Sequence, residues 1–261
     1  MLSSHILFQP SRGGRLLIFL LLLASLSAGC KKNSVHEDNP AVLQLLNAMD
    51  NGLELRTNYA GQHPITYYTA LKLWNKQFGP FNTNYISQFP QPLALYGEAD
   101  TLEKSIPVLD LQLELEPGGI YSLFVYGSKT DPGNLLHKDV HPVGNFADSL
   151  SFIRVVNLCP DQSISVNLKG QPAGSTAGQV DFRGVSEFAG HRITASTLSL
   201  EFEVRDAATG SLLTSLTTDP VQNNYGGKNL YINKSNSLVF VGRKDGTGVN
   251  APQLLLMVHS Y

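Results

Sequence analysis

The stretch that most constrains the fold of this chain is residues 151–170, SFIRVVNLCPDQSISVNLKG. Its first part, residues 152–156, is rich in the β-branched and aromatic types that strands favour. Arg154 interrupts this apolar run, which indicates a face partly exposed to water. Pro160-Asp161 then favours a turn, because proline has no N–H to donate and Asp can bond its own backbone. Residues 163–169 alternate polar and apolar with a period of two, so the stretch predicts a strand, a tight turn and a second, paired strand.

A weaker copy of this stretch precedes it at residues 41–58, AVLQLLNAMDNGLELRTN. Two aliphatic residues precede Asn47 in the first copy, as Val155 and Val156 precede Asn157 in the second. Later landmarks also match: SLFVYG at residues 122–127 and SLVFVG at 237–242 are each followed by a Leu-Leu strand and a His. A repeat of this length has the size of a domain. The sequence therefore predicts two tandem domains, residues 41–146 and 147–261.

Three segments of the second copy resemble a known bacterial envelope domain, the domain of unknown function 4397 (DUF4397). They are residues 153–161, IRVVNLCPD, residues 200–213, which contain LEFEVRD and TGSLL, and residues 237–242. The family more often has Ser at the place of Cys159. The resemblance implies an immunoglobulin-like β-sandwich and brings no established activity. The expected fold is therefore all-β, with two tandem immunoglobulin-like β-sandwich domains after a lipoprotein signal peptide.

The first thirty residues are typical of an export signal. Arg12 and Arg15 precede an apolar run, residues 16–26, which is short for a membrane-spanning helix. Residues 26–30, LSAGC, resemble the lipobox of bacterial lipoproteins. We therefore expect a signal peptide over residues 1–29, a tether over 30–40, and acyl chains such as palmitate on Cys30 that anchor the protein to the outer membrane. The membrane face stays open, and the alternative is an ordinary secretory signal that leaves Cys30 free.

Charge and cysteine content exclude several classes of function. The chain has 19 Lys plus Arg against 21 Asp plus Glu, and removing a leader that contains Arg12 and Arg15 makes it more acidic. No cluster of basic residues indicates a nucleic-acid partner. Cys159 is the only other cysteine, so lipidation of Cys30 leaves no pair for an internal disulfide. We expect Cys159 to be buried and inert.

Nine of the aromatic residues, including the only Trp, lie in the stretch from Tyr59 to Tyr96. One interpretation is that these rings fill the sandwich core and the gaps under loops. The other is a binding surface on which rings stack against sugars or a partner's peptide. The residues expected to form that surface are Tyr67, Tyr68, Trp74, Phe78 and Tyr85.

Motifs of catalysis are missing from the sequence. It contains neither His-Glu-x-x-His nor Gly-x-Ser-x-Gly, and no phosphate-binding glycine loop precedes a helix. His137, Asp139 and His141 share one face if they lie on a strand, which permits a metal site. Such trios are more often solvated surface, so we expect no catalytic residues, no metal and no cofactor.

The sequence therefore predicts a non-enzymatic, lipid-anchored cell-envelope protein that acts as a binding or structural module. Its partners would be the membrane, through the lipid on Cys30, and a glycan or another envelope protein. A carbohydrate-binding accessory lipoprotein that uses residues 67–89 is the alternative. A hydrolase is the least supported class.

Overall fold

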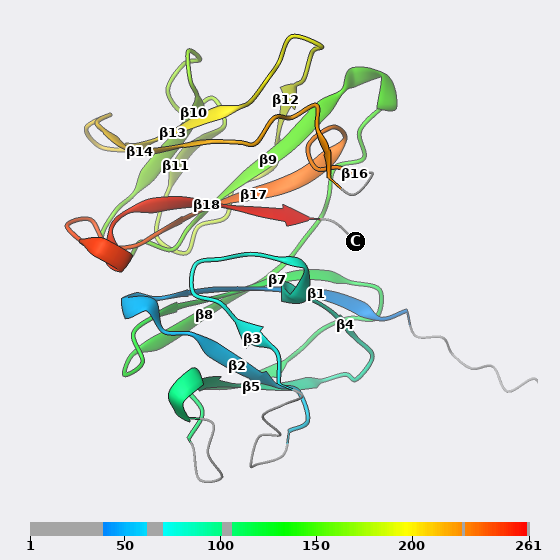
Figure 1. Cartoon of the computed structure of the whole chain (residues 1–261), viewed down its shortest axis with the longest axis vertical. Helices are drawn as coiled ribbons and strands as arrows, with labels where there is room; N and C mark the ends of the chain where they lie inside the picture. Colours follow the sequence, from blue (N-terminus) through cyan, green and yellow to red (C-terminus); the bar gives the residue numbers. More distant parts are fainter. Residues whose placement is uncertain (1–38, 62–69, 101–105, 226–227, 260–261) are drawn as a thin grey trace, which may run out of the picture. The chain divides into compact units, whose positions relative to one another are not determined.

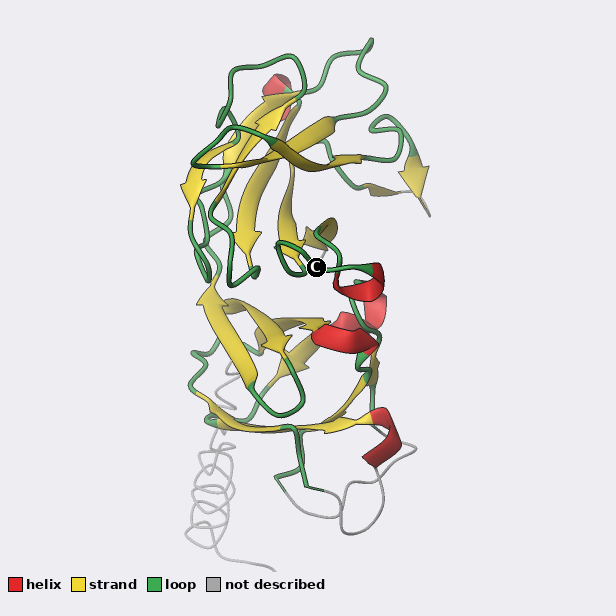
Figure 2. Ribbon diagram, turned by 90° about the vertical axis from the view of Figure 1, so that its left-hand side faces the viewer, coloured by secondary structure: helices red, strands yellow, loops and turns green. Residues whose placement is uncertain are grey.

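The computed structural model of the chain describes residues 39–61, 70–100, 106–225 and 228–259. In these ranges the chain forms strands, loops and one-turn 3₁₀-helices, and no α-helix (Figures 1 and 2). None of the helices within them is long and apolar enough to span a bilayer. Residues Asn39–Tyr261 belong to one compact unit. The predicted all-β fold of tandem sandwiches is confirmed.

The first sandwich consists of two four-stranded sheets that share a core. One sheet has the order β4 (Thr83–Ile86), β1 (Ala41–Met49), β7 (Ile120–Gly127) and β8 (Pro132–Lys138). The other has the order β3 (Lys72–Leu73), β2 (Leu55–Asn58), β5 (Gln91–Gly97) and β6 (Leu109–Leu113). The central strands β1 and β7 are parallel and largely buried on both faces, as parallel strands usually are.

The second sandwich is built in the same way. One sheet has the order β12 (Ala189–Arg192), β9 (Leu150–Asn157), β17 (Lys234–Val241) and β18 (Gln253–His259). The other has the order β11 (Ala177–Val180), β10 (Ile164–Leu168), β13 (Glu201–Asp206) and β14 (Leu212–Thr217). Strands β15 (Asn224–Tyr225) and β16 (Lys228–Asn229) form a separate two-stranded sheet.

The two sandwiches repeat one topology strand for strand. The order β4-β1-β7-β8 corresponds to β12-β9-β17-β18, and the central pair is parallel in both. The register is also the same, since Gln44 lies opposite Ser122 and Arg154 lies opposite Ser237. The predicted duplication of the strand order is therefore present in the structure. The boundary between residues 146 and 147 stays a prediction.

The pairing predicted for the two strands of residues 151–170 is wrong. Strands β9 and β10 belong to opposite sheets of the second sandwich, and β6 and β7 belong to opposite sheets of the first. The connection over residues 158–163 is too long for a two-residue hairpin turn, and it crosses from one sheet to the other. By contrast, β13 and β14 do form a hairpin, whose connection spans residues 207–211.

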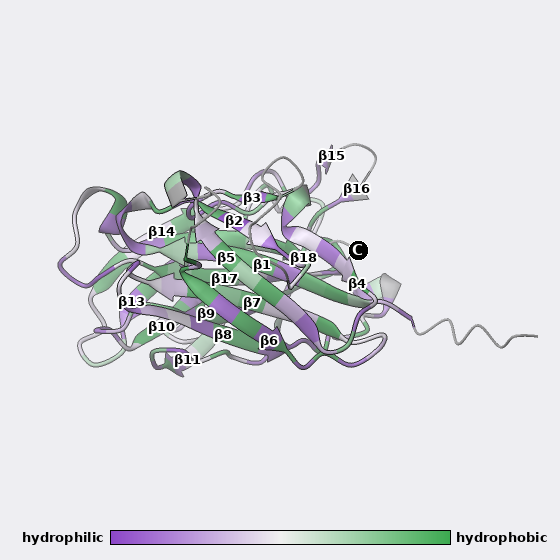
Figure 3. Cartoon of the chain, turned by 90° about the horizontal axis from the view of Figure 1, so that it is seen from below, coloured by the Kyte–Doolittle hydropathy of each residue, from purple (hydrophilic) through white to green (hydrophobic). Residues whose placement is uncertain are grey.

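A third apolar cluster joins the two sandwiches. Along β1 and β7, Leu45 and Leu123 face the first core, so Leu46 and Phe124 face the other way. The cluster comprises residues from both sandwiches: Leu46, Ala48, Phe124, Val156, Leu158, Val239, Val241 and Met257. The apolar residues on these strands appear as green segments in Figure 3. We call this contact the joint.

Candidate functional site

A cluster of buried polar side chains continues the joint along the same strand faces. Gln44 precedes Leu46 by two residues on β1, and Arg154 precedes Val156 by two on β9, so each polar residue shares a face with its apolar neighbour. The Arg154 cluster consists of Gln44, Ser122, Asp139, Arg154, Ser237 and His259, all of them buried. Three come from each sandwich.

Arg154 lies at the centre of this cluster. Its Nη1 donates to Asp139 Oδ1 at 2.6 Å, its Nη2 to Ser122 Oγ at 3.1 Å, and its Nε to Ser237 Oγ at 2.7 Å. Arg154 is only 1% exposed, so the expectation that it marks a partly wet strand face is wrong. A buried guanidinium is tolerated because it is paired and hydrogen-bonded on every side.

The carboxylate of Asp139 stays ionised in this enclosed position. Burial by itself raises the pKa of Asp139, but the hydrogen bond with His137, the charge of Arg154 and the bonds from Arg154 and Ser122 together hold it well below its usual range. The two oxygens accept separate bonds, Oδ1 from Arg154 and Oδ2 from the Ser122 hydroxyl at 2.6 Å. Asp139 is therefore a permanent negative charge opposite a permanent positive one.

The pattern of contacts across the joint resembles that of a twofold-symmetric dimer. The shared register makes Gln44 equivalent to Arg154 and Ser122 equivalent to Ser237. Asp139 and His259 also occupy equivalent places. Asp139 N donates to Ile120 O at the start of β7, and His259 pairs with Ser235 near the start of β17. Arg154 contacts Asp139, and its equivalent Gln44 contacts His259, the equivalent of Asp139. Such reciprocal contacts define an isologous interface.

One pair in the cluster has the geometry of an activated nucleophile. Ser237 Oγ lies 2.6 Å from His259 Nε2, and His259 Nδ1 is hydrogen-bonded to Gln44 Oε1. A serine beside a histidine that is held by a third group is the arrangement of acyl-transfer enzymes. Ser237 is fully buried and also accepts a bond from Arg154, and the Phe188 ring lies 5.0 Å from the guanidinium and 6.3 Å from the His259 ring. The geometry therefore serves the joint and presents no nucleophile to a substrate.

His259 makes the joint sensitive to acid. Burial, reinforced by the charge of Arg154, lowers the pKa of His259 to about 3, against 6.5 for an exposed histidine. The unfolded chain therefore binds one more proton than the folded chain between these values. The stability from the neutral His259 is complete above pH 6.5 and decreases as the pH falls towards 3, by about 1.4 kcal/mol per pH unit.

We expect a loss of about 2 kcal/mol in the free energy of unfolding between pH 6.5 and pH 5 from His259 alone. Urea denaturation at a series of pH values measures it. His259→Gln keeps an amide in the same place without a titrating ring, so its pH slope is expected to be shallower by about one proton. Equal slopes for the two proteins would contradict the assignment, whatever His141 and His191 contribute to both.

A metal site does not fit the donor groups present. Of the predicted trio, His137 contacts Asp139 at 2.9 Å, while the ligand atoms of Asp139, His141 and His259 all lie within 4.8 Å of one another. Both ring nitrogens of His259 already have hydrogen-bond partners, and the Arg154 cation is bonded to Asp139. A metal ion there would be repelled by Arg154, and the single carboxylate of Asp139 already balances the charge of that guanidinium.

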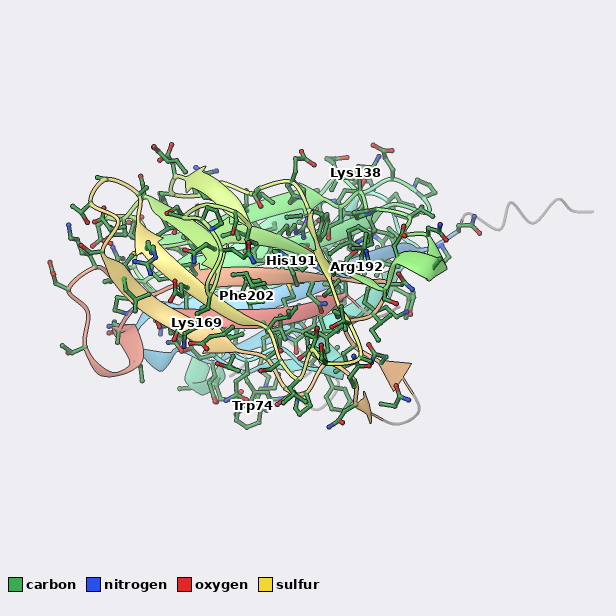
Figure 4. All side chains as sticks on the ribbon, turned by 90° about the horizontal axis from the view of Figure 1, so that it is seen from above. Trp74, Lys138, Lys169, His191, Arg192 and Phe202 are labelled. Carbon is green, nitrogen blue, oxygen red and sulfur yellow. The ribbon has the colours of Figure 1, made fainter. Side chains whose placement is uncertain are left out.

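The predicted ligand-binding residues lie in different environments. Tyr67, Tyr68 and Cys30 are outside the described residues. Trp74 is 49% exposed at the periphery (Figure 4), with Lys72 Nζ 3.7 Å from its ring, and Phe78 packs against the joint. Tyr85, on β4, is 64% exposed and lines an open hollow of about 490 Å³. Tyr85 therefore lines a hollow, whereas Trp74 makes a cation–π contact with Lys72.

Two smaller hollows border the joint. One, of about 190 Å³, is lined by residues that include His137, Arg154, Glu187 and Phe188. The other, of about 250 Å³, lies beside the edge-on contact of Tyr126 with Phe182 and the 2.7 Å ion pair of Asp50 with Arg243. Arg154 in the first is paired with Asp139, and Arg243 in the second with Asp50, so neither arginine is left as an unpaired cation for a ligand.

Cys159 is buried and free, as expected. Burial, together with the hydrogen bond from its Sγ to Asp161 Oδ1 at 3.1 Å, raises the pKa of the thiol to about 12. A thiol this far from ionisation is neither a nucleophile nor a redox group at neutral pH.

Comparisons with known proteins add little to this geometry. Neither a family model nor a curated protein matches the sequence, so the resemblance to DUF4397 stays a prediction. Among solved structures, the chain is similar to the crystal structure of a "putative adhesin" from Bacteroides ovatus. The TM-score is 0.25 and the sequence identity 9%, over 85% of this chain and 94% of that chain. A likeness of this size assigns no function, because unrelated functions share sandwich folds.

Proposed function

We propose that the chain is a non-enzymatic, lipid-anchored cell-envelope protein whose two sandwiches act together as one binding or structural module. The observation that carries the proposal is the Arg154–Asp139 pair, which is buried between the sandwiches beside an apolar cluster drawn from both. The groups with catalytic geometry, Ser237 and His259, are enclosed in this joint. What remains for partners is the outer surface of a unit with little freedom to flex.

The outward faces of the two outer sheets suit such a role. They carry ion pairs, among them Arg56 with Glu98 on one and Lys169 with Glu201 on the other. The more exposed of these, Lys169 with Glu201, contributes little to stability. These pairs keep the faces soluble and leave them open to a glycan or an envelope protein. Nothing in their mixed charge selects nucleic acid.

The lipid anchor has a direct test. We expect the wild-type protein to sediment with membranes, and Cys30→Ser to appear in the soluble fraction or to remain unprocessed, because the acyl chains supply the membrane affinity. Fractionation and incorporation of labelled palmitate measure both properties. Cys159→Ser is the matched control, since that thiol is buried, and it is expected to fractionate like wild type. Wild-type levels of Cys30→Ser in the membrane would rule out the anchor.

The absence of enzymatic activity is also part of the proposal. Purified protein is expected to show no turnover in a broad screen of hydrolase substrates, with divalent metal ions added and with chelator. Turnover that disappears in Ser237→Ala or His259→Gln would show that the enclosed Ser–His pair becomes accessible, and would replace the module by a hydrolase.

A second candidate function is the binding of glycans. The observation that favours it is the hollow beside Tyr85, since an exposed ring next to neutral amide side chains suits a sugar. A glycan array probed with the full chain tests this class of ligand.

A further inference from the structure

In the largest of the hollows described above, the lining residues that lie in the described part of the chain carry no charge. Its walls come from three segments of the first sandwich: the start of the loop after β2, strand β4 with the residues that follow it, and the start of β5. The lining residues that the structure describes are Tyr59, Asn84, Tyr85, Ile86, Ser87, Gln88 and Gln91. These include two phenol rings and three amides, which recognise ligands that are neutral and rich in hydroxyl groups.

Two polar groups in this wall lack a hydrogen-bond partner. They are the hydroxyl of Tyr59 and the amide nitrogen of Asn84, and both are buried. Burial raises the pKa of Tyr59, so its hydroxyl is a neutral donor. A buried polar group without a partner is costly, and few occur in folded proteins. A ligand hydroxyl that formed hydrogen bonds with these two groups would relieve that cost.

The rim of the hollow is suited to admit such a ligand. Tyr85 is 64% exposed, and Ser87 and Gln88 are exposed as well, so these side chains can shift without disturbing the core. Behind them, Gln91 is buried and fixed by bonds from its amide nitrogen to Tyr59 O at 3.0 Å and Pro92 O at 2.7 Å. An exposed ring beside a fixed amide side chain suits a site that stacks one face of a ligand and bonds its edge.

We propose that this hollow is a binding site for a neutral oligosaccharide. Tyr85 stacks on the apolar face of a sugar ring, and Tyr59, Asn84 and Gln88 bond its hydroxyls. The absence of a cationic side chain among the described lining residues argues against phosphate or sulfate groups. An extended peptide added to the edge strand β4 fits less well, because β4 offers only four residues, Thr83–Ile86, as a template. The proposal rests on the second candidate function, that the chain binds glycans.

The test uses the full chain and a panel of neutral hexasaccharides with gluco, xylo, manno and galacto backbones, beside a sulfated heparin hexasaccharide. Binding is measured by calorimetry. At least one neutral hexasaccharide is expected to bind. Tyr85→Ala is expected to lower the affinity for that hexasaccharide by about tenfold or more. Trp74→Ala is the matched control, since it removes another exposed aromatic ring elsewhere, and it is expected to leave the affinity within about twofold.

Tyr59→Phe gives a sharper test, because its two expected effects have opposite signs. Deleting a buried hydroxyl without a partner is expected to raise the urea midpoint of the free protein. The same substitution is expected to lower the affinity for the oligosaccharide, because it removes one hydrogen bond to the ligand. A lower midpoint would overturn the role given to Tyr59.

The failures can be told apart. If no hexasaccharide binds, the glycan function and the site fail together. If Trp74→Ala abolishes binding and Tyr85→Ala does not, glycan binding stands and this site is wrong. If only the heparin hexasaccharide binds, or a peptide selected from a random library binds through Tyr85, the assigned ligand class is overturned.

Discussion

Arg154→Met is expected to lower the free energy of unfolding by about 3–5 kcal/mol, the cost of leaving one member of a buried ion pair without its partner. Met has a similar length and fills much of the same space, so the loss reports on charge more than on a cavity. Asp139 would keep only the bonds with Ser122 and His137, with its carboxylate still enclosed. Urea denaturation followed by fluorescence measures the change.

Two further variants separate this effect from the loss of any ion pair. Lys169→Met breaks the pair with Glu201, which lies open to water, and is expected to leave the urea midpoint unchanged. Arg154→Met combined with Asp139→Leu removes both charges, and most of the lost stability is expected to return. If Arg154→Met alone matches wild type, the pair is not what holds the sandwiches together, and the proposal of one rigid module loses its main support.

The fold was predictable to the level of the repeat, because strands leave a local trace in sequence. Alternation with a period of two over residues 163–169 identified β10, and the matching motifs at 122–127 and 237–242 identified β7 and β17. Which strands pair with each other was harder to predict from the sequence. Whether β9 turns back on β10 or crosses to the opposite sheet depends on which partners compete for its edges, and those partners lie far away in the chain.

The joint could not be found from sequence for a related reason. A lone Arg in a strand indicates a wet face unless a carboxylate lies opposite, and Asp139 lies on the other sandwich after a different strand. One signal was available: Gln44 and Arg154 occupy the same place in the two copies, on the face shared with Leu46 and Val156. Polar residues at matching positions on faces that are otherwise apolar in both copies indicate a polar patch within a buried contact.

The two asparagines of the repeat are expected to have the next largest effect after Arg154. Asn157 Nδ2 donates to Gln162 O at 2.7 Å and Val180 O at 3.0 Å, and its Oδ1 accepts from Cys159 N at 2.9 Å. Asn47 makes the same set, with Leu53 O at 2.8 Å, Leu73 O at 3.0 Å and Met49 N at 3.1 Å. Each holds the crossing between the sheets of its sandwich.

We expect Asn47→Ala and Asn157→Ala each to lower the free energy of unfolding by about 3 kcal/mol, because each leaves buried backbone groups without partners. Both side chains are fully buried, so water cannot replace the lost bonds. Asn250→Ala is the control: its amide bonds with Asn51 are exposed, and a change within about 0.5 kcal/mol is expected. Urea denaturation compares the three variants.

Comparing the two substitutions also tests whether the two sandwiches unfold as one unit. If the sandwiches unfold as one unit, each variant shows a single transition at a lower urea midpoint, whichever sandwich carries the change. Two separate transitions, with only the mutated sandwich shifted, would mean that the joint does not couple them, and the Arg154–Asp139 pair would then be a local contact. A large effect for Asn157→Ala beside none for Asn47→Ala would show that the copies share hydrogen bonds without sharing their energetic weight.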